Sequence, residues 1–458
     1  MWTRLLPAVQ PGTGAVPVQW EIARDERFRD IAQRGASSAQ PAWGYSVHVD
    51  VDGLNPGTAY WYRFAALGAR SPAGRTHTAP AGTATRLRFA FASCQQYEQG
   101  YYAAYRHMAA EPLDLVVHLG DYIYESSWGR RHVRSHDAPE PVTLDDYRAR
   151  YALYKSDRDL QAAHAAFPWI VTWDDHEVQN DYANDRSERL DDPEAFLVRR
   201  AAAYQAYYEH MPLPAWARPR GPHMQLYTRV PYGDLASFHV LDGRQYKSPQ
   251  VCPVAGYGGS NTVLASQCPE RMDAAQSFLG MRQEQWLRDG LRASTSRWNI
   301  VAQQTLMAQA DRGPGAEQQF WTDGWDGYPR ARERLLREFS GGRIGNPLVI
   351  GGDVHMAAVA DLKVDFDDPQ SPVVATEFCG TSITSQGPSA KRVETILAKN
   401  PHIKLADGAR RGYTVLDITR EHCVATLRAL NDVRDPASGI YDFARFAVEN
   451  GKPGAART

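Results

Sequence analysis

Four ionisable residues follow one of the most apolar stretches of this chain. In WIVTWDDHEVQND, residues 169–181, the run from Trp169 to Trp173 changes abruptly into Asp-Asp-His-Glu. Four such neighbours at the end of a buried strand would repel one another and resist the loss of water, so a positive charge is expected among them. A bound metal ion is the simplest source of that charge.

Two further apolar segments end in the same way. LDLVVHLGDYIYE ends a strand-like run in Asp121 and Tyr124, and NPLVIGGDVHM ends one in Asp353 and His355. Side chains at the carboxyl ends of strands meet at one edge of the sheet in an α/β enzyme. The three segments together predict a metal site assembled from distant parts of the sequence.

The candidate ligands are of two chemical kinds. Thiolate, imidazole and phenolate groups suit a transition metal, whereas carboxylate and amide oxygens suit calcium, magnesium or manganese. Asp121 could bridge the two kinds of ion. Two metal ions a few ångström apart can hold one water and lower its pKa from ~15.7 towards ~7, and the resulting hydroxide would attack phosphorus in line with the leaving oxygen. The first kind comprises Cys94, Tyr124 and His355, and the second Asp175, Asn180 and Asp353.

Each residue also has a structural interpretation when it is taken alone. A Gly-Asp pair after a strand is a common turn, so Asp121 alone would indicate a turn residue. Cys94 alone would indicate a small core residue, and Tyr124 a half-buried aromatic. His118 and His239 lie inside predicted strands and are interpreted as core histidines. Three such strand ends in one domain favour the metal site over these separate interpretations.

The overall composition excludes several classes of protein. The 458 residues are enough for two or three domains, and an apolar content of 43% with a charged content of 23% is ordinary for a globular protein. A net charge of −2 gives no broad basic surface for nucleic acid or an acidic membrane. No apolar stretch is long enough for a membrane span. Residues 1–25 lack a signal peptide, because Pro7 interrupts the apolar residues at once. Taken literally, the sequence indicates a cytosolic protein.

The first 80 residues are predicted to form a β-sandwich of the immunoglobulin or fibronectin type. Apolar residues alternate with polar ones in AVPVQWEI and in GYSVHVDV, residues 44–51. Tyr60 follows a Pro-Gly turn, as at a common corner of such sandwiches. The Pro/Gly/Thr-rich segment 71–86 is predicted to be a linker.

After the linker, strands alternate with helices. This pattern predicts an α/β catalytic domain over residues 87–458, with a mixed sheet or two stacked sheets and helices outside. Helices are predicted at 100–111, 143–154 and 192–211, the second with Thr143 as its N-cap and Asp146 three residues later. Strands are predicted at 87–94, 114–121, 168–175, 235–242, 299–305, 347–353, 357–362, 373–379, 413–418 and 423–430.

Two of the five cysteines are candidates for a disulfide. Cys252 and Cys268 flank the Gly/Ser/Asn-rich loop CPVAGYGGSNTVLASQC, and the absence of any CxxC pair excludes a zinc ribbon. A disulfide would close this loop and imply an oxidising compartment. The disulfide is favoured over two unpaired surface thiols, because the loop has little apolar content to hold it in place.

A set of motifs resembles a known family. FASC, GDYIYE, AAFPWIVTWDDHE, LDGRQY and GGDVH occur in this order after the fibronectin-like segment. In this combination the chain resembles the PhoD-type alkaline phosphatases and phosphodiesterases of the calcineurin-like metallophosphoesterase superfamily. The resemblance implies a four-layer α/β/β/α catalytic domain and a ferric iron (Fe3+) beside one or two calcium ions (Ca2+). It also implies hydrolysis of phosphomonoesters and phosphodiesters, and export through the twin-arginine route.

The resemblance also implies roles for individual residues. His176 occupies the position of an imidazole near the leaving oxygen, as proton donor or charge stabiliser. Arg244 is a candidate phosphate clamp whose loss would mainly weaken substrate binding, with an ordinary surface arginine as the alternative. Loss of Asp121 is expected to abolish turnover and release metal. The implied iron ligands are Cys94, Asp121, Tyr124 and His355, and the implied calcium ligands are Asp121, Asp175, Asp353 and Asn180.

Two weaker features lie elsewhere in the predicted catalytic domain. Trp325 and Asp326, in DGWDGYP, are interpreted as a rim or lid of the site, or else as a structural turn. The loop CGTSIT, residues 379–384, could offer backbone donors to a substrate.

The family pattern also bears on the location of the protein. At the start of this chain the first strand of the sandwich and the export leader of the family are expected to be missing. Iron with millimolar calcium nevertheless favours a periplasmic or secreted protein. A monomer is the default expectation.

Other classes of protein fit less well. A Ser-His-Asp hydrolase is disfavoured because GxSxG is absent and Ser260 lies in a loop without a preceding strand. A dehydrogenase is disfavoured because no GxGxxG joins a strand to a helix. The remaining alternatives are a phosphodiesterase or phospholipase D-like enzyme acting on lipid or cell-wall phosphodiesters, and a non-catalytic binding protein of the same fold.

Overall fold

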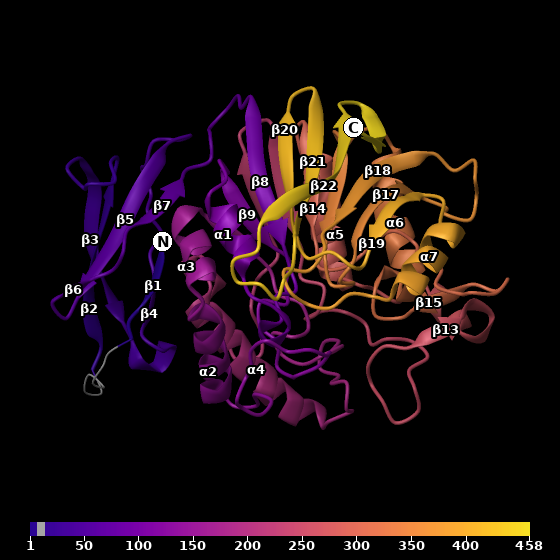
Figure 1. Cartoon of the computed structure of the whole chain (residues 1–458), viewed down its shortest axis with the longest axis horizontal. Coiled ribbons are helices and arrows are strands. Elements are labelled where there is room, and N and C mark those ends of the chain that lie inside the picture. The colour runs from indigo at the N-terminus through magenta and orange to yellow at the C-terminus, as the bar shows by residue number, and fades with distance from the viewer. Residues whose placement is uncertain (7–13) are drawn as a thin grey trace.

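The N-terminal part of the chain forms two small β-sheets that pack together (Figure 1). The computed structural model describes residues 1–6 and 14–458. Val18, Val47 and Phe64 belong to the apolar core between the two sheets. One sheet contains β1 (Trp2–Arg4) and β4 (Ser46–His48), and the other contains β2 (Val16–Ala23), β3 (Ile31–Ala39), β5 (Ala59–Ala66), β6 (Ala69–Arg70) and β7 (Gly74–His77).

Tyr60 confirms the predicted corner of this sandwich, because its buried hydroxyl oxygen accepts a hydrogen bond from the backbone N–H of Asn55 at 2.9 Å. Two expectations were wrong. The strand expected over 44–51 is limited to β4, since Tyr45 has a left-handed φ of 58°. The expected linker at 71–86 contains β7, which pairs with β5. The proposed division into domains at 1–80 and 87–458 stays a prediction.

A first seven-stranded sheet begins the remainder of the chain. Its strand order is β10-β9-β8-β20-β21-β22-β23. β8, β9 and β10 are parallel to one another, so their carboxyl ends lie at the same edge, and β20 joins them antiparallel to β8. The strands are β8 (Arg86–Ala92), β9 (Leu115–His118), β10 (Trp169–Val171), β20 (Gly412–Thr419), β21 (His422–Leu430), β22 (Ile440–Glu449) and β23 (Lys452–Arg457).

A second seven-stranded sheet has the order β11-β12-β14-β16-β18-β17-β19. Its four central strands β12, β14, β16 and β18 are parallel, whereas β11, β17 and β19 are antiparallel to their neighbours. A separate pair, β13 (Thr262–Leu264) and β15 (Gln319–Trp321), lies outside both large sheets. The strands of the second sheet are β11 (Thr228–Tyr232), β12 (Ala236–Val240), β14 (Trp298–Ala302), β16 (Pro347–Gly351), β17 (Ala357–Lys363), β18 (Val373–Cys379) and β19 (Ile403–Asp407).

The two large sheets are apolar on both faces, so they stack on each other and are covered by helices outside. In the layer between them, the rings of Phe89 and Phe238 lie 5.0 Å apart. Helices α1–α4 cover the outer face of the first sheet, and α5–α7 cover that of the second. This arrangement confirms the four-layer α/β/β/α fold. Among the described residues, no helix combines the length and apolar character needed to cross a membrane.

The three predicted helices are present, and the cap predicted for the second is a complete capping box. The Thr143 hydroxyl accepts the N–H of Asp146 at 3.3 Å, and the Asp146 carboxylate accepts the N–H of Thr143 at 2.8 Å. Four further helices were not predicted. The helices are α1 (Ala103–Ala109), α2 (Leu144–Lys155), α3 (Arg158–Ala166), α4 (Pro193–His210), α5 (Met281–Ala293), α6 (Pro329–Ser340) and α7 (Ala390–Lys399).

Cys252 and Cys268 form a disulfide, with their Cα atoms 6.0 Å apart. The alternative of two unpaired surface thiols is therefore wrong. Cys268 packs with Val251 and Val263 in a small apolar cluster, so the bridge joins the loop to a local core that is too small to hold it alone.

This pairing predicts a definite thiol count. Protein unfolded in denaturant with chelator, but without reductant, should show three reactive thiols per chain, because only Cys94, Cys379 and Cys423 are free. Reduction should raise the count to five. Five reactive thiols before reduction in protein purified under alkylating conditions would contradict the disulfide.

Candidate functional site

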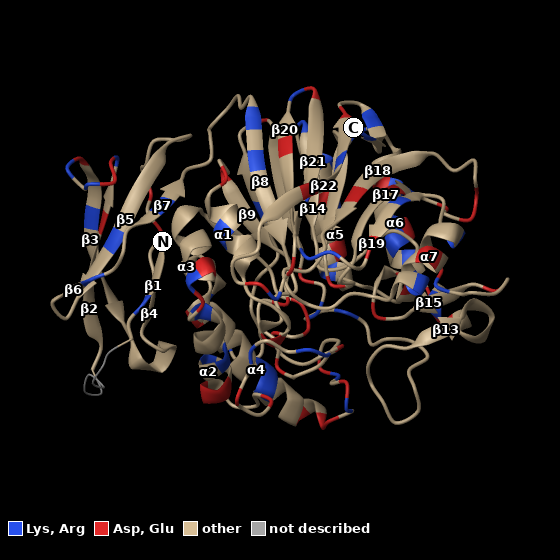
Figure 2. Cartoon of the chain, viewed as in Figure 1, with Lys and Arg blue, Asp and Glu red and all other residues tan. Residues whose placement is uncertain are grey.

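Strand ends from both large sheets meet in one place. Cys94 follows β8, Asp121 follows β9 and the Asp174–Glu177 turn follows β10, whereas Asp353 and His355 follow β16 of the second sheet. Figure 2 shows acidic and basic residues on the loops below the lower edges of the two sheets. The predicted convergence of distant strand ends is therefore present in the fold.

One group of side chains combines sulfur, nitrogen and oxygen. Ligand atoms of Cys94, Asp121 and His355 all lie within 4.8 Å of one another. The Tyr124 hydroxyl is 2.8 Å from Oδ2 of Asp121 and 3.0 Å from Nε2 of His355. All four side chains predicted to hold iron thus come together.

A second group consists of carboxylates and shares a member with the first. Asp121, Asp174 and Asp353 have oxygens within 4.8 Å of one another. Asp121 also belongs to a group with Asp175 and His176. The bridging position expected for Asp121 is consistent with this geometry. Asp174 was not among the predicted ligands, although it stands beside Asp175 in the sequence.

The backbone is left-handed at four of these positions. Cys94, Asp121, Asp353 and His355 have φ values of 59°, 55°, 60° and 52°. Non-glycine residues seldom adopt this conformation, which costs about 1–3 kcal/mol each and is concentrated at functional sites. Each left-handed residue turns the chain sharply at the end of its strand, and its side chain thereby enters the shared cluster.

Two glycines permit the strand ends to approach so closely. Gly120 has a φ of 110°, and a Cβ there would lie 2.6 Å from the backbone nitrogen of Asp174. A Cβ on Gly352 would lie 2.3 Å from the Ser93 hydroxyl oxygen. The first contact joins the ends of β9 and β10, and the second joins the ends of β16 and β8 across the two sheets.

Buried hydrogen bonds hold the ligand-bearing turns. The carboxylate of Glu177 accepts the backbone N–H groups of Asp121, Tyr122 and Asp174 at 3.2, 2.5 and 2.7 Å. On the other side, Nδ1 of His355 lies 3.1 Å from the backbone carbonyl of Gln386. If Nδ1 carries the proton and donates it there, Nε2 faces the cluster with a free lone pair.

His176 has a partner that sequence reasoning missed. Its Nδ1 lies 2.6 Å from Oε2 of the buried Glu125, whose other oxygen accepts the backbone N–H of Asn180 at 2.9 Å. Burial opposes the protonation of His176, but the charges of Glu125, Asp175 and Asp121 raise its pKa well above the ordinary value. The only sequence signal for this partner was its position in GDYIYE.

Arg244 is buried, so its interpretation as an ordinary surface arginine was wrong. Its Nε donates to Asp174 at 2.5 Å, Nη1 lies 2.9 Å from Oδ2 of Asp323, and Nη2 lies 3.5 Å from Asp175. Lys247 pairs with the same Asp323 at 2.5 Å. The structure thus shows Arg244 as a counter-ion for acidic residues beside the cluster.

Asn180 donates its side-chain amide to Glu188 at 2.6 Å, and its assignment as a calcium ligand stays a prediction. The next residue along the chain, Asp181, does lie beside other acidic side chains. Asp181 has oxygens within 4.8 Å of those of Asp175 and Asp323, and its backbone N–H donates to Asp175 at 2.7 Å.

The proposed lid was a wrong interpretation, and the structural-turn alternative is confirmed. Trp325 is buried and donates its indole N–H to Gln303 at 3.1 Å, and Asp326 pairs with Arg332 at 2.7 Å. Both side chains are therefore part of the protein core and do not cover the site.

In the loop at 379–384, the last two backbone N–H groups already donate to protein carbonyls. The N–H groups of Ile383 and Thr384 donate to the carbonyls of Ser93 and Cys94 at 3.0 and 3.3 Å. These donors stabilise the left-handed turn at Cys94. They are consequently not free for a substrate.

His118 and His239 are buried inside β9 and β12, which confirms their interpretation as core histidines. Burial lowers the pKa of His118 to about 3 and that of His239 to about 4. Among the described residues, neither imidazole belongs to a cluster of His, Cys, Asp or Glu side chains that could hold a metal ion.

The cluster has the electrostatics of a cation site. Burial raises the pKa of Asp121 to about 7 and that of Asp174 to about 8, and it raises the pKa of Cys94 and Asp353 well above their ordinary values. Among the described residues, Oδ1 of Asp121, Oδ2 of Asp174 and Oδ2 of Asp353 are buried without a hydrogen-bond partner. A cation would satisfy these oxygens and stabilise the ionised forms, so the residues present fit bound metal.

Comparisons with known proteins agree with this geometry. Sequence profiles of the PhoD-like phosphatases and of their N-terminal domain match residues 89–427 and 1–80. The chain is 47% identical to alkaline phosphatase D of Bacillus subtilis (strain 168) over 470 residues, which cover 99% of this chain and 79% of that protein. A solved structure described as the structure of PhoD matches with a TM-score of 0.94 and 45% identity, over 100% of this chain and 88% of that one. The chain therefore belongs to the PhoD-like phosphatase family and is an enzyme for metal-dependent hydrolysis of phosphate esters.

Proposed function

We propose that this enzyme works with two adjacent cations held by the strand-end cluster. One would lie beside the thiol, phenol and imidazole of the first group, and the other beside Asp174 and Asp353. Asp121 would be a ligand of both. The observation that supports this proposal is that Asp121 belongs to both groups, while one of its buried oxygens has no hydrogen-bond partner among the described residues.

The two groups favour different ions. Thiolate and phenolate together favour ferric iron, whereas a set of carboxylate oxygens favours calcium. When bound, such cations lower the pKa of a nearby water and withdraw charge from the phosphate oxygens. Asp175 and Asn180 remain proposed calcium ligands beside Asp121 and Asp353, with Asp174 added because its oxygen lies in the same group.

His176 is proposed as the proton donor to the leaving oxygen. Its Nδ1 is engaged by Glu125, so Nε2 is the nitrogen that remains for the substrate. The charges of Glu125, Asp175 and Asp121 raise the pKa of the imidazole, and this favours the protonated form that a donor requires. Glu125 would fix the orientation of the ring and stabilise its positive charge.

Arg244 is proposed to act differently from the phosphate clamp expected from the sequence. Its guanidinium is already paired with Asp174 and Asp323, so it would neutralise the acids around the cations and fix their positions. Of its three nitrogens, Nη2, which lies 3.5 Å from Asp175, could contact phosphate without either pair opening.

The name of the relative favours phosphate monoesters as substrates, and we propose this class for the present chain. No observation favours the alternative of a phospholipase D-like enzyme for lipid or cell-wall diesters. The disulfide supports a periplasmic or secreted location. Recovery of the protein in a cytosolic fraction with Cys252 and Cys268 reduced would exclude that location.

Asp121→Asn tests the shared ligand. Loss of one charge from both groups should lower turnover of a chromogenic phosphate monoester on the order of a thousandfold or more. Elemental analysis should show reduced occupancy of both metals. Asp289→Asn, an exposed carboxylate on α5, is the matched control and should behave as wild type. Full content of both metals with substantial turnover in Asp121→Asn would contradict the shared-ligand proposal.

Arg244→Met tests the counter-ion role. The substitution leaves buried carboxylates without their partner, which should cost about 3–5 kcal/mol of unfolding free energy. We expect a loss of stability in denaturant titrations and a lower kcat. Arg292→Met removes an exposed ion pair with Glu338 and should change stability by less than about 1 kcal/mol. A change in KM alone, at unchanged stability, would restore the phosphate-clamp interpretation.

Glu125→Gln tests the role of the His176 partner. Because the Glu125 charge raises the pKa of His176, its removal should lower that pKa. The imidazole then loses its proton at a lower pH, so the alkaline limb of kcat/KM should move towards acid. A pH–rate profile of metal-loaded protein measures this shift. An alkaline limb that stays in place would show that His176 is not the group titrating there.

A further inference from the structure

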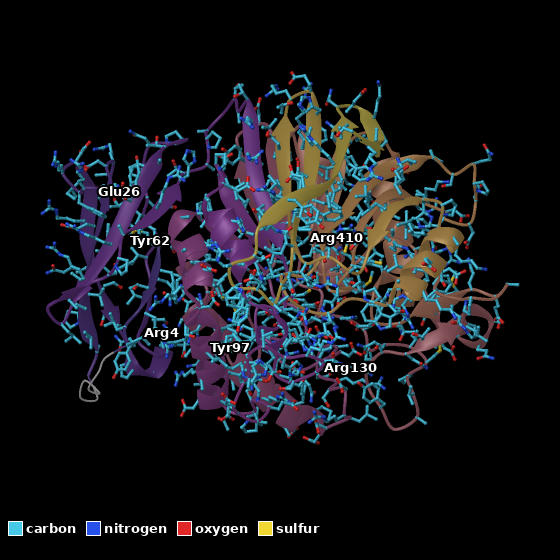
Figure 3. All side chains as sticks on the ribbon, in the orientation of Figure 1. Arg4, Glu26, Tyr62, Tyr97, Arg130 and Arg410 are labelled. Carbon is cyan, nitrogen blue, oxygen red and sulfur yellow. A yellow bond between two sulfur atoms is a disulfide. The ribbon has the colours of Figure 1, made fainter. Side chains whose placement is uncertain are left out.

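A cavity separates the N-terminal sheets from the helices of the catalytic domain. Its volume is about 740 Å³, within the range of small-molecule sites. The walls come from β1, β5 and β7 on one side and from α2, α3 and the start of β10 on the other. Figure 3 shows Arg4 and Tyr62, two of the lining residues, at this boundary.

The walls of the cavity are mainly apolar and aromatic. Trp2, Tyr62 and Phe64 line one side, and Phe167 and Trp169 line the other. These rings offer apolar surface that an aliphatic or aromatic group could cover. The metal cluster lies elsewhere, since none of its ligands lines this cavity.

The charged groups of the cavity all have one sign. Arg4, Arg75 and Lys155 line it, and no Asp or Glu is found among its described lining residues. The whole chain, by contrast, has 51 basic and 53 acidic residues. The imbalance is therefore local, and it favours an anion.

Lys155 is the group that most needs a partner. Within the described part of the chain its ammonium makes no ion pair and no hydrogen bond, although Arg4 next to it donates to the Gly44 carbonyl at 2.9 Å. The nearest groups are the rings of Trp2 and Tyr122, whose centroids lie 4.6 and 5.2 Å away. Burial and the charge of Arg4 lower the pKa of Lys155 to about 7.

A purely structural explanation does not account for this arrangement. A lysine in the last turn of α2 is favoured by the helix dipole, and the rings of Trp2 and Tyr122 add cation–π attraction. Neither contribution carries a net negative charge. Lys155 is half-buried at the apolar wall, and an ammonium that loses part of its water without gaining an anionic partner is less stable there than in bulk water.

We propose that this cavity binds an amphipathic anion, an apolar chain with one carboxylate or phosphate head, with the head at Lys155 and the chain against the aromatic walls. The head would form charge-assisted hydrogen bonds with the ammonium. The site is separate from the catalytic cluster, so its ligand is not the substrate of hydrolysis.

Dodecanoate, below its micelle concentration, is the probe for this site. A form brominated at the end of the chain should quench part of the tryptophan fluorescence, because Trp2 and Trp169 line the cavity. Calorimetry should give one site per chain. Dodecylphosphonate, which contains no ester bond, is the second probe, and the tighter of the two ligands identifies the preferred head group.

Lys155→Met keeps an apolar side chain of similar length and removes the charge. It should raise the dissociation constant of dodecanoate by about tenfold or more and leave that of dodecanol unchanged. Ala152→Trp, which fills the cavity without changing its charge, should abolish binding of both. Lys452→Met is the matched control, since Lys452 is exposed and paired with Glu449.

Phosphatase activity should match wild type in all three variants, because none of these residues belongs to the catalytic cluster. Lys155→Met should unfold at the wild-type temperature or above it, because it loses a partly desolvated charge. Failure of wild-type protein to bind either anion would overturn the proposal. Equal binding of dodecanoate by wild type, Lys155→Met and Ala152→Trp would overturn it as well, because it would place the ligand outside the cavity.

Discussion

Crowding of buried acidic groups is the constraint on which this structure depends. Oxygens of the buried Asp121 and Asp174 and of the half-buried Asp353 lie close to one another, with a thiol and a phenol beside them. Burial alone would keep these groups protonated, as the raised pKa values of Asp121 and Asp174 express. The pair of cations that we propose would remove this conflict and would also activate water and polarise a phosphate. In this proposal the same cations stabilise the ionised ligands and supply the chemistry of the site.

The fold fixes the positions of the side chains in this cluster. Two stacked sheets direct their parallel strand ends to one region, and left-handed residues such as Cys94 and His355 turn the chain there. Gly120 removes the steric obstacle between neighbouring ends, and Glu177 ties the backbone of two of them together. Arg244 then balances part of the negative charge from outside the cluster. The helices contribute by burying the sheets rather than by supplying ligands, and the sandwich packs against α3 and α4.

The sequence predicted those parts of the fold and the site that depend on local pattern. An apolar run that ends in acidic or imidazole groups identifies a strand and its functional end, as for Asp121 and His355, and Thr143 with Asp146 identifies a helix start. Tertiary partners were not predictable in this way. The burial of Arg244 depends on Asp323, 79 residues later, and the choice between Asp174 and Asp175 depends on the direction of a turn. Helix α5 lacks a side-chain cap at its first turn, so no capping residue marked its start.

The most direct test is a crystal structure of the metal-loaded enzyme with anomalous data collected on both sides of the iron edge. Our account predicts two cations of different elements roughly 3.5–4 Å apart, with Asp121 bound to both and the Cys94 sulfur bound to the heavier one. A single cation, or two cations that do not share Asp121, would contradict it.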